Sequence, residues 1–248
     1  MAERQAERQV ASGELDVFDD PDAVADAVAS WLLGQAEGKE RFTVSLSGGS
    51  TPKRLYERLA SPAFRDRFPW DRTEWFFGDE RFVPKDDKDS NYRMVNEAML
   101  SRAPAPADSV HAFDTSLESP QEAALAYEEE LKCFYGADAL DPARPLFDVT
   151  LLGLGPDGHT ASLIPGQPVL DERERWAAAV TEGRPEARLT LTYPVIASSR
   201  AIAFLVTGAD KAAMLAHVRS GAEDVPAGRL RTRAEVHWFV DEAAAGRS

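Results

Sequence analysis

Cysteine is scarce in this 248-residue sequence, which contains one such residue, and long apolar runs are absent. A single cysteine excludes an internal disulfide and a cysteine zinc site and favours a reducing compartment. We expect that residue, Cys133, to be a small buried side chain on a helix. No run of 18 apolar residues occurs, and the charged start "MAERQAERQ" lacks the apolar stretch of a signal peptide. These features predict a cytoplasmic protein without a membrane span.

The charge balance also narrows the class of partner. The chain has 28 basic and 42 acidic residues, a formal net charge of −14. A surface of this sign disfavours nucleic acid and anionic membranes as partners, although a local basic pocket is compatible with it. We therefore expect no nucleic-acid or membrane partner. The sequence does not give the oligomeric state, and the expectation is a monomer or small homo-oligomer.

Short β-rich apolar runs alternate with amphipathic helical patterns along the chain. The runs cover residues 42–46, 74–77, 147–152, 201–206 and 236–240. The clearest helical patterns begin at the Asp20-Pro21 pair and at Pro52, and cover residues 120–135 and 210–221. This alternation is typical of βαβ units and predicts one α/β domain with a largely parallel sheet.

Ligands of such sheets bind beyond the carboxyl ends of the strands, so the residues that follow each strand deserve comparison. "SGGST" after the first run combines glycines and hydroxyls and could offer backbone N–H groups to a phosphate, or form a plain turn. Asp79, Glu80 and Arg81 follow the second run, where a solvated turn is the alternative. Lys211 lies near a helix start, where an anionic ligand would explain a cation and a solvated side chain is the simpler interpretation.

"LLGLGPDGHTASLIPG", at the end of the 147–152 run, has the G-x-G-x-x-G spacing of a dinucleotide loop. Pro156 has no N–H to donate and Asp157 would repel a pyrophosphate, so we regard the spacing as accidental. His159 lies two residues from Asp157, and a carboxylate can orient an imidazole that takes a proton from water. A locally bonded residue at a helix N-terminus is the structural alternative for His159. His111, His217 and His237 are expected to be structural or surface residues.

Several of these stretches together resemble a known family. Six stretches resemble ordered motifs of the glucosamine-6-phosphate isomerase/6-phosphogluconolactonase family: "SLSGGSTPKRLY", "FFGDERFVPKDDKDSNYRMVNEAML", "FDVTLLGLGPDGHTASLIPG", "RLTLTYPVI", "VTGADKAAML" and the terminal "WFVDEAA". The similarity covers residues 15–245 and implies a single Rossmann-like, NagB/RpiA-like domain with helices on both faces of a largely parallel sheet. Residues 1–14 would then be a poorly ordered extension.

The resemblance implies hydrolysis of 6-phosphoglucono-1,5-lactone in the pentose phosphate pathway, with no metal and no organic cofactor. It makes His159 the general base and Asp157 its partner. The family motifs also supply the residues expected around the sugar phosphate, namely Gly48, Gly49, Ser50, Thr51, Asp79, Arg81, Asn91, Arg188 and Lys211. Ile164 departs from the family pattern, which usually has phenylalanine there.

Two other functions are compatible with parts of this pattern. Glucosamine-6-phosphate isomerases or deaminases resemble the chain but carry a carboxylate after the histidine, in a pattern like H-I-A-F-N-E-P-G, where this chain has "HTASLIPG". A non-catalytic sugar-phosphate sensor would need a DNA-binding module, and no helix-turn-helix pattern is apparent. The missing carboxylate and the retained Asp157–His159 pair favour the lactonase.

Overall fold

A parallel sheet of seven strands forms the centre of the computed structural model, which describes residues 7–247. Its spatial order is β2 (Glu14–Phe18), β12 (Glu235–Asp241), β10 (Ser199–Val206), β7 (Phe147–Leu152), β3 (Phe42–Leu46), β4 (Thr73–Phe77) and β6 (Val110–His111). All neighbouring pairs are parallel. The sequence predicted the five central strands. It missed β2 and β6 because these edge strands are only partly buried and lack a continuous apolar run.

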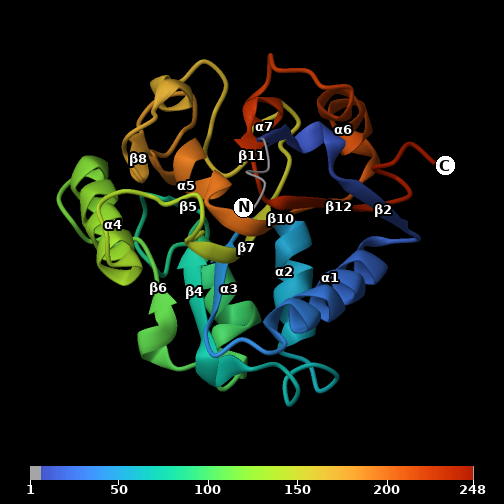
Figure 1. Cartoon of the computed structure of the whole chain (residues 1–248), viewed down its shortest axis with the longest axis horizontal. Coiled ribbons are helices and arrows are strands. Elements are labelled where there is room, and N and C mark those ends of the chain that lie inside the picture. Colours follow the sequence, from blue (N-terminus) through green and yellow to red (C-terminus); the bar gives the residue numbers. More distant parts are fainter. Residues whose placement is uncertain (1–6, 248) are drawn as a thin grey trace.

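Helices lie on both faces of this sheet, as the Rossmann-like prediction required. They are α1 (Pro21–Ala36), α2 (Ser50–Leu59), α3 (Asn91–Ala98), α4 (Pro120–Tyr135), α5 (Tyr193–Ala197), α6 (Ala212–Arg219) and α7 (Pro226–Arg229). Figure 1 shows α1 and α2 on one side of β10 and β12, and α5, α6 and α7 on the other. The N-cap of α1 follows the sequence signal, since Asp20 accepts hydrogen bonds from the N–H groups of residues 22 and 23.

The strand order creates one point at which the connections diverge. From β3 the chain crosses through α2 to β4 on one side, whereas from β7 it proceeds to β10 on the other side. Neighbouring loops separate at such a switch point and leave a crevice beyond the carboxyl ends of the two strands. The topology therefore places a ligand site between the segments that follow β3 and β7.

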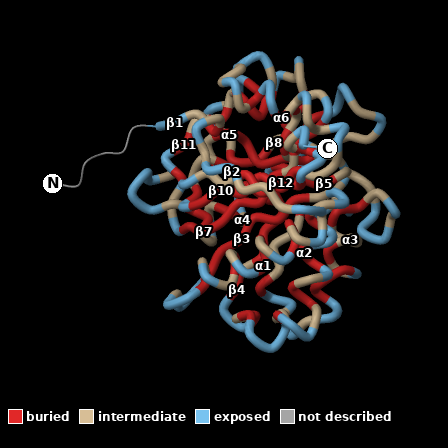
Figure 2. Tube along the Cα trace, turned by 90° about the vertical axis from the view of Figure 1, so that its right-hand side faces the viewer, coloured by how far each residue is buried: buried red, intermediate tan, exposed pale blue. Residues whose placement is uncertain are grey.

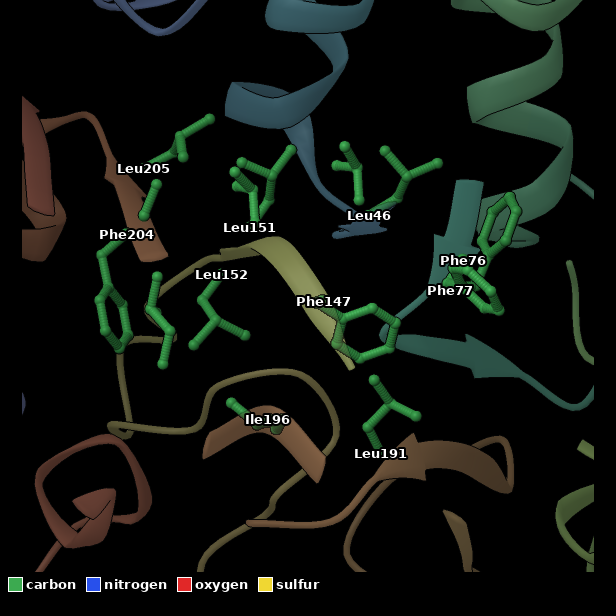
Figure 3. Close-up of a cluster of buried hydrophobic side chains, with 14 of the residues drawn as sticks. Leu46, Phe76, Phe77, Phe147, Leu151, Leu152, Leu191, Ile196, Phe204 and Leu205 are labelled. Carbon is green, nitrogen blue, oxygen red and sulfur yellow. The ribbon is translucent and has the colours of Figure 1, made fainter. Parts of the chain in front are cut away.

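One buried cluster of apolar side chains runs from Val10 to Ala244 and packs on both faces of the sheet. Figure 3 shows part of it, with Phe147, Leu151 and Phe204 from neighbouring strands directed toward side chains of the covering elements. Figure 2 shows the buried segments gathered along the strands. Each such large side chain contributes about 1.5–3 kcal/mol relative to an exposed one, so the sheet is a rigid support for the loops at its edge.

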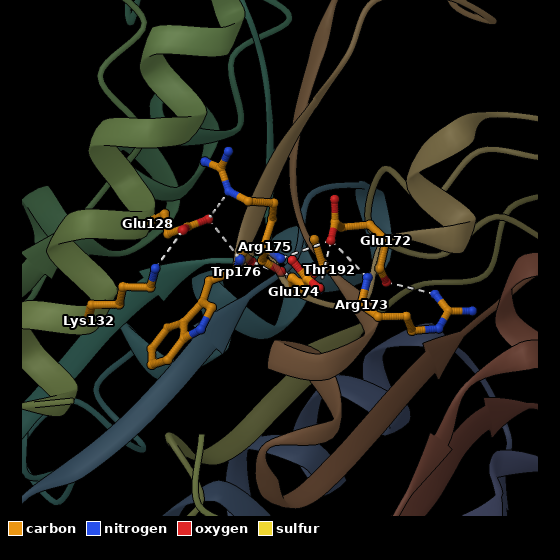
Figure 4. Close-up of polar contacts among 8 residues, drawn as sticks. All are labelled: Glu128, Lys132, Glu172, Arg173, Glu174, Arg175, Trp176 and Thr192. Carbon is orange, nitrogen blue, oxygen red and sulfur yellow. Dashed lines mark hydrogen bonds and ion pairs between the residues drawn. The ribbon is translucent and has the colours of Figure 1, made fainter. Parts of the chain in front are cut away.

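A second, antiparallel sheet stands beside the main one. It consists of β5 (Asp79–Arg81), β9 (Arg188–Leu191) and β8 (Ala177–Val180). Glu128 of α4 connects this sheet to the helix. One of its carboxylate oxygens accepts a hydrogen bond from Lys132 Nζ at 2.7 Å, and the other accepts from Arg175 Nε at 2.7 Å and the Trp176 N–H at 2.9 Å (Figure 4). This buried carboxylate fixes the start of β8, and through β8 it fixes β9.

The N-terminal segment corrects one prediction. Residues 1–6 of the expected extension lie outside the described residues, but residues 7–14 are not poorly ordered. β1 (Arg8–Gln9) pairs with β11 (Arg231–Thr232), Val10 is fully buried, and Trp238 Nε1 donates to the Val10 carbonyl at 2.9 Å. Val10, the one large apolar side chain among residues 7–14, therefore fastens this segment to the body of the domain.

Cys133 also differs from its prediction, because it is exposed. The buried face of α4 is formed by Ala124, Tyr127 and Leu131, among others, and position 133 points away from it. Among residues 7–247, none of the helices has the length and apolar character needed to cross a membrane.

Candidate active site

A cavity of about 350 Å³ opens at the switch point, beyond the carboxyl ends of β3, β4, β7 and β10. Its walls include ten of the eleven side chains or backbone positions predicted as site residues, namely Gly48, Gly49, Ser50, Thr51, Asp79, Arg81, Asn91, His159, Arg188 and Lys211. The eleventh, Asp157, lies directly behind His159. The fold thus brings together residues spread over more than 160 positions of the sequence.

His159 and Asp157 form a hydrogen-bonded pair at this cavity. His159 Nδ1 lies 2.5 Å from Asp157 Oδ1, and none of the described residues forms a hydrogen bond with Nε2. The alternative for His159 as a helix N-terminal residue is wrong, because the segment after β7 is a series of turns. The pair has the arrangement of an oriented general base, with one ring nitrogen held and the other available.

Glycines shape the turn that carries this pair. A Cβ on Gly155 would lie 2.0 Å from His159 Nδ1, so any side chain there would displace the imidazole. Gly158 has φ +78°, a left-handed conformation that L-residues adopt at a cost. The glycine spacing that imitates a dinucleotide loop therefore serves to seat the histidine ring.

Asp157 is held as a carboxylate. Burial opposes its ionisation, but hydrogen bonds from His159 and Arg184 outweigh that effect and hold the pKa of Asp157 far below its usual value. Arg184 Nη2 lies 2.5 Å from the second carboxylate oxygen. A carboxylate that stays ionised can stabilise the imidazolium formed when His159 takes a proton.

The loop after β3 has the geometry expected of an anion site. Gly49, with φ +107°, directs the backbone into α2, whose first turn contains Ser50 and Thr51. Thr51 Oγ1 lies 2.7 Å from Thr207 Oγ1, which joins this loop to the end of β10. Gly48 is required by contact, since a Cβ there would lie 2.1 Å from the Asn91 side-chain oxygen.

The Asp79-Glu80-Arg81 stretch corrects the solvated-turn alternative, because Asp79 and Glu80 are buried. Asp79 accepts hydrogen bonds from Ser162 Oγ at 2.7 Å and from Asn91 Nδ2 at 3.2 Å. Glu80 accepts from the first N–H groups of α3, those of Asn91 at 2.6 Å and Tyr92 at 2.7 Å. Burial raises the pKa of Glu80, although these N–H groups oppose the rise. The acidic residues thus position Asn91 and Arg81.

Four cationic side chains line the cavity among the described residues: Arg184, which contacts Asp157, and the three predicted from sequence, Arg81, Arg188 and Lys211. Arg81 and Arg188 are direct partners across β5 and β9, and the Nε atom of each is buried without a hydrogen bond among the described residues. Burial and the neighbouring Arg81 lower the pKa of Arg188. Lys211 stands at the start of α6, as predicted, with Asp210 at 3.3 Å. Unused guanidinium donors and adjacent like charges indicate a place for an anion.

The family model described as glucosamine-6-phosphate isomerases/6-phosphogluconolactonase matches residues 19–238 of this sequence. The chain belongs to the glucosamine-6-phosphate isomerase/6-phosphogluconolactonase family.

Individual relatives of this family are similar over most of the chain. A 6-phosphogluconolactonase of Nostoc sp. is 40% identical over 224 residues, 88% of this chain and 90% of that protein. The solved 6-phosphogluconolactonase of Trypanosoma cruzi is 28% identical and superposes with a TM-score of 0.82 over 95% of this chain and 96% of that one. A monomeric glucosamine-6-phosphate deaminase, 20% identical, superposes with a TM-score of 0.81 over 95% of this chain and 100% of that one, and shows the shared fold alone.

The structure adds residues to the site that the sequence did not single out. Ser162 bonds Asp79, Thr207 bonds Thr51, and Arg184 reaches Asp157 from the loop between β8 and β9. Ile164, noted as a departure from the family pattern, is a buried wall of the cavity. Arg184 in "TEGRPEAR" lies in no recognisable motif that marks it, whereas Ser162 lies three residues from His159 and could have been included on proximity.

Proposed function

We propose that this protein hydrolyses 6-phosphoglucono-1,5-lactone to 6-phosphogluconate, a step of the pentose phosphate pathway, with His159 as general base. One observation carries the proposal: the Asp157–His159 pair faces the same cavity as Arg188, Lys211 and the Gly48–Thr51 loop. A base with an ionised partner suits attack by water, and an N–H-rich loop with cations suits a phosphate. The 6-phosphogluconolactonase relatives support the same substrate.

In this mechanism His159 Nε2 takes a proton from water as the water oxygen attacks the lactone carbonyl carbon. The carbonyl electron pair moves onto oxygen, and nearby N–H groups or cations of the cavity stabilise that charge. Collapse of the tetrahedral intermediate breaks the bond to the ring oxygen, which receives the proton back from His159. The new carboxylic acid loses its proton to solvent, so each turnover releases one proton, and no acyl-enzyme forms.

The phosphate group of the substrate would hold the lactone in the cavity at a point distant from the reacting carbonyl. We assign it to the side of the cavity formed by the Gly48–Thr51 loop, Arg188 and Lys211, where donors and positive charge gather. Contacts so far from the carbonyl orient the lactone without taking part in the chemistry. Their loss should therefore weaken substrate binding more than it slows the bound reaction.

The isomerase or deaminase alternative is disfavoured by the composition of the cavity wall. Where the related pattern H-I-A-F-N-E-P-G has glutamate, this chain has Ile164, which is buried and apolar. Opening and isomerising an amino sugar needs more proton transfers than lactone hydrolysis, and position 164 offers no group for them. Glucosamine 6-phosphate should accordingly yield no ammonia.

Proton release from freshly prepared 6-phosphogluconolactone, corrected for spontaneous hydrolysis, tests the proposal. Wild type and the control His217→Ala should share one rate, and His159→Ala should lose about a hundredfold or more. A wild-type rate at background would refute the lactonase function. Full activity of His159→Ala would refute only the assigned base.

The same proposal includes a cytoplasmic location and a small-molecule substrate, with no nucleic-acid or membrane partner. The single, exposed Cys133 and the net charge of −14 support this part.

A further inference from the structure

Arg184 is the one cation at the cavity whose contact is with the Asp157–His159 pair. Its Nη2 lies 2.5 Å from Asp157 Oδ2 and 3.2 Å from His159 Nδ1. Two donors, one from His159 and one from Arg184, thus divide the two oxygens of a single carboxylate. The three side chains form a compact cluster in which each contacts the other two, and Arg184 reaches it from the loop between β8 and β9.

The Arg184 side chain is itself held in place. Nη1 donates to the Gly183 carbonyl at 2.9 Å, which folds the guanidinium back over its own loop. Gly183 has φ +80°, and a Cβ there would lie 3.0 Å from Gln167 Nε2 and 3.3 Å from Ile164 Cγ2. The loop is therefore seated on residues 164–167, just beyond the turn that carries His159. Four residues after Arg184 the chain enters β9 at Arg188, which also lines the cavity.

Asp157 needs such a partner because of where it stands. Its side chain is 37% exposed, on a turn rather than on a strand or helix. With Oδ2 bonded only to water, the carboxylate could rotate and Oδ1 would lose its alignment with Nδ1 of His159. Displacement of a catalytic group by about 1 Å costs on the order of a hundredfold in rate.

We propose that Arg184 is a positioning residue for the proposed hydrolysis: it pins Asp157 Oδ2, so that Oδ1 holds the His159 ring with Nε2 directed to the substrate. This inference rests on the proposed function for its kinetic consequence, but the arrangement it describes exists without substrate. Arg184 acts through Asp157, and its role differs from that of the cations assigned to the phosphate.

A double-mutant cycle with Asp157 tests this role. Arg184→Gln should lower kcat by roughly ten- to a hundredfold with KM changed less than about threefold, and Arg184→Lys should recover part of the loss. In an Asp157→Asn background, Arg184→Gln should cost less than about threefold more, because its target is already altered. Arg233→Gln, a charge-matched change outside the cavity, should leave kcat and KM unchanged.

Equal losses from Arg184→Gln in both backgrounds would overturn the proposal, and so would an effect on KM alone, which would assign Arg184 to substrate binding. Unchanged melting temperatures of the variants would show that the losses are not due to unfolding.

A second readout separates this proposal from the proposed function. In the free protein, nuclear magnetic resonance of the His159 ring should show a low-field Nδ1–H proton in wild type, Arg184→Lys and Arg233→Gln, and its loss or marked weakening in Arg184→Gln. The same signal in Arg184→Gln as in wild type would overturn the positioning role, even if the wild-type protein hydrolysed no lactone.

Discussion

Glu128 and Asp157 are carboxylates that each contact two basic side chains, and they differ in what those partners leave unbonded. Glu128 is buried, and both of its oxygens are satisfied by Lys132, Arg175 and a backbone N–H (Figure 4). Asp157 is equally saturated by His159 and Arg184, but it stands at a cavity and its imidazole partner keeps one nitrogen unbonded among the described residues. The same electrostatics therefore yields a structural anchor in one place and a candidate catalytic pair in the other.

Replacing Asp157 should produce the largest effect and should separate the two centres. Asp157→Asn is expected to lower kcat by about a hundredfold or more, because the imidazolium loses its ionised partner, while the melting temperature changes little. Kinetics and thermal unfolding of this variant and of Asp66→Asn, an exposed control, would check it. Full activity of Asp157→Asn would contradict the assignment of Asp157 to a catalytic pair and leave it no different in function from Glu128.

Removing a cavity cation should affect binding and spare the Asp157–His159 pair. Lys211→Ala is expected to raise KM about tenfold or more with a smaller change in kcat, because the phosphate contact is the same in ground and transition states. Lys88→Ala, an exposed lysine outside the cavity, serves as the control. A pure kcat effect would place Lys211 at the reacting carbonyl instead.

Replacing Glu128 should act on stability alone. Glu128→Gln is expected to cost about 1–2 kcal/mol, a loss of about 2–8 °C in melting temperature, with kcat within about twofold of wild type. The exposed neighbour Glu129→Gln is the matched control. A tenfold loss of kcat at unchanged stability would contradict the assignment of Glu128 as a structural anchor.

The Glu128 effect should also depend on pH. Burial opposes ionisation of this carboxyl, but Lys132, Arg175 and the Trp176 N–H hold its pKa below the usual 4.5. A group whose folded pKa is depressed contributes stability above its unfolded pKa and loses that contribution as the pH falls. The difference between wild type and Glu128→Gln should thus be full above about pH 5 and shrink toward pH 3, as measured by thermal unfolding.

Replacing His111, whose two ring nitrogens both contact glutamates, should have the smallest effect on the free energy of unfolding. His111 contacts Glu130 Oε1 through Nδ1 at 2.7 Å and Glu74 Oε2 through Nε2 at 3.1 Å. Burial opposes its protonation, but the two glutamates outweigh burial and raise the pKa of His111. A raised folded pKa stabilises the protein below the unfolded value near 6.5, and this contribution is lost as the pH rises through the folded value.

His111→Gln should therefore be less stable than wild type by about 1 kcal/mol or less at pH 6, with the gap closing toward pH 9. Lactone hydrolysis should be unaffected. Equal gaps at both pH values in thermal unfolding would mean that packing on Phe76, rather than charge, accounts for the loss.

The sequence predicted what depends on local pattern and missed what depends on distant contacts. β3, β7 and α4 are continuous apolar or amphipathic runs, and their predicted and observed bounds coincide. His159 and Asp157 lie two residues apart, so their pairing could be proposed from spacing. Nothing local marks Arg184, whose partner lies 27 residues away, and the exposure of Cys133 depends on which face of α4 packs. The burial of Asp79 and Glu80 follows from a second sheet that no strand pattern predicted.

The paired guanidinium groups of Arg81 and Arg188 have a thermodynamic consequence. Arg81 and Arg188 are cross-strand neighbours on β5 and β9, and burial together with the charge of Arg81 lowers the pKa of Arg188, so a bound dianion should stabilise the pair. Inorganic phosphate and 6-phosphogluconate should therefore act as stabilisers in proportion to their occupancy. The melting temperature of a variant such as Arg188→Leu should rise less than that of wild type when either anion is added. Binding of an anion thus contributes to the free energy of unfolding in addition to the packing of the fold.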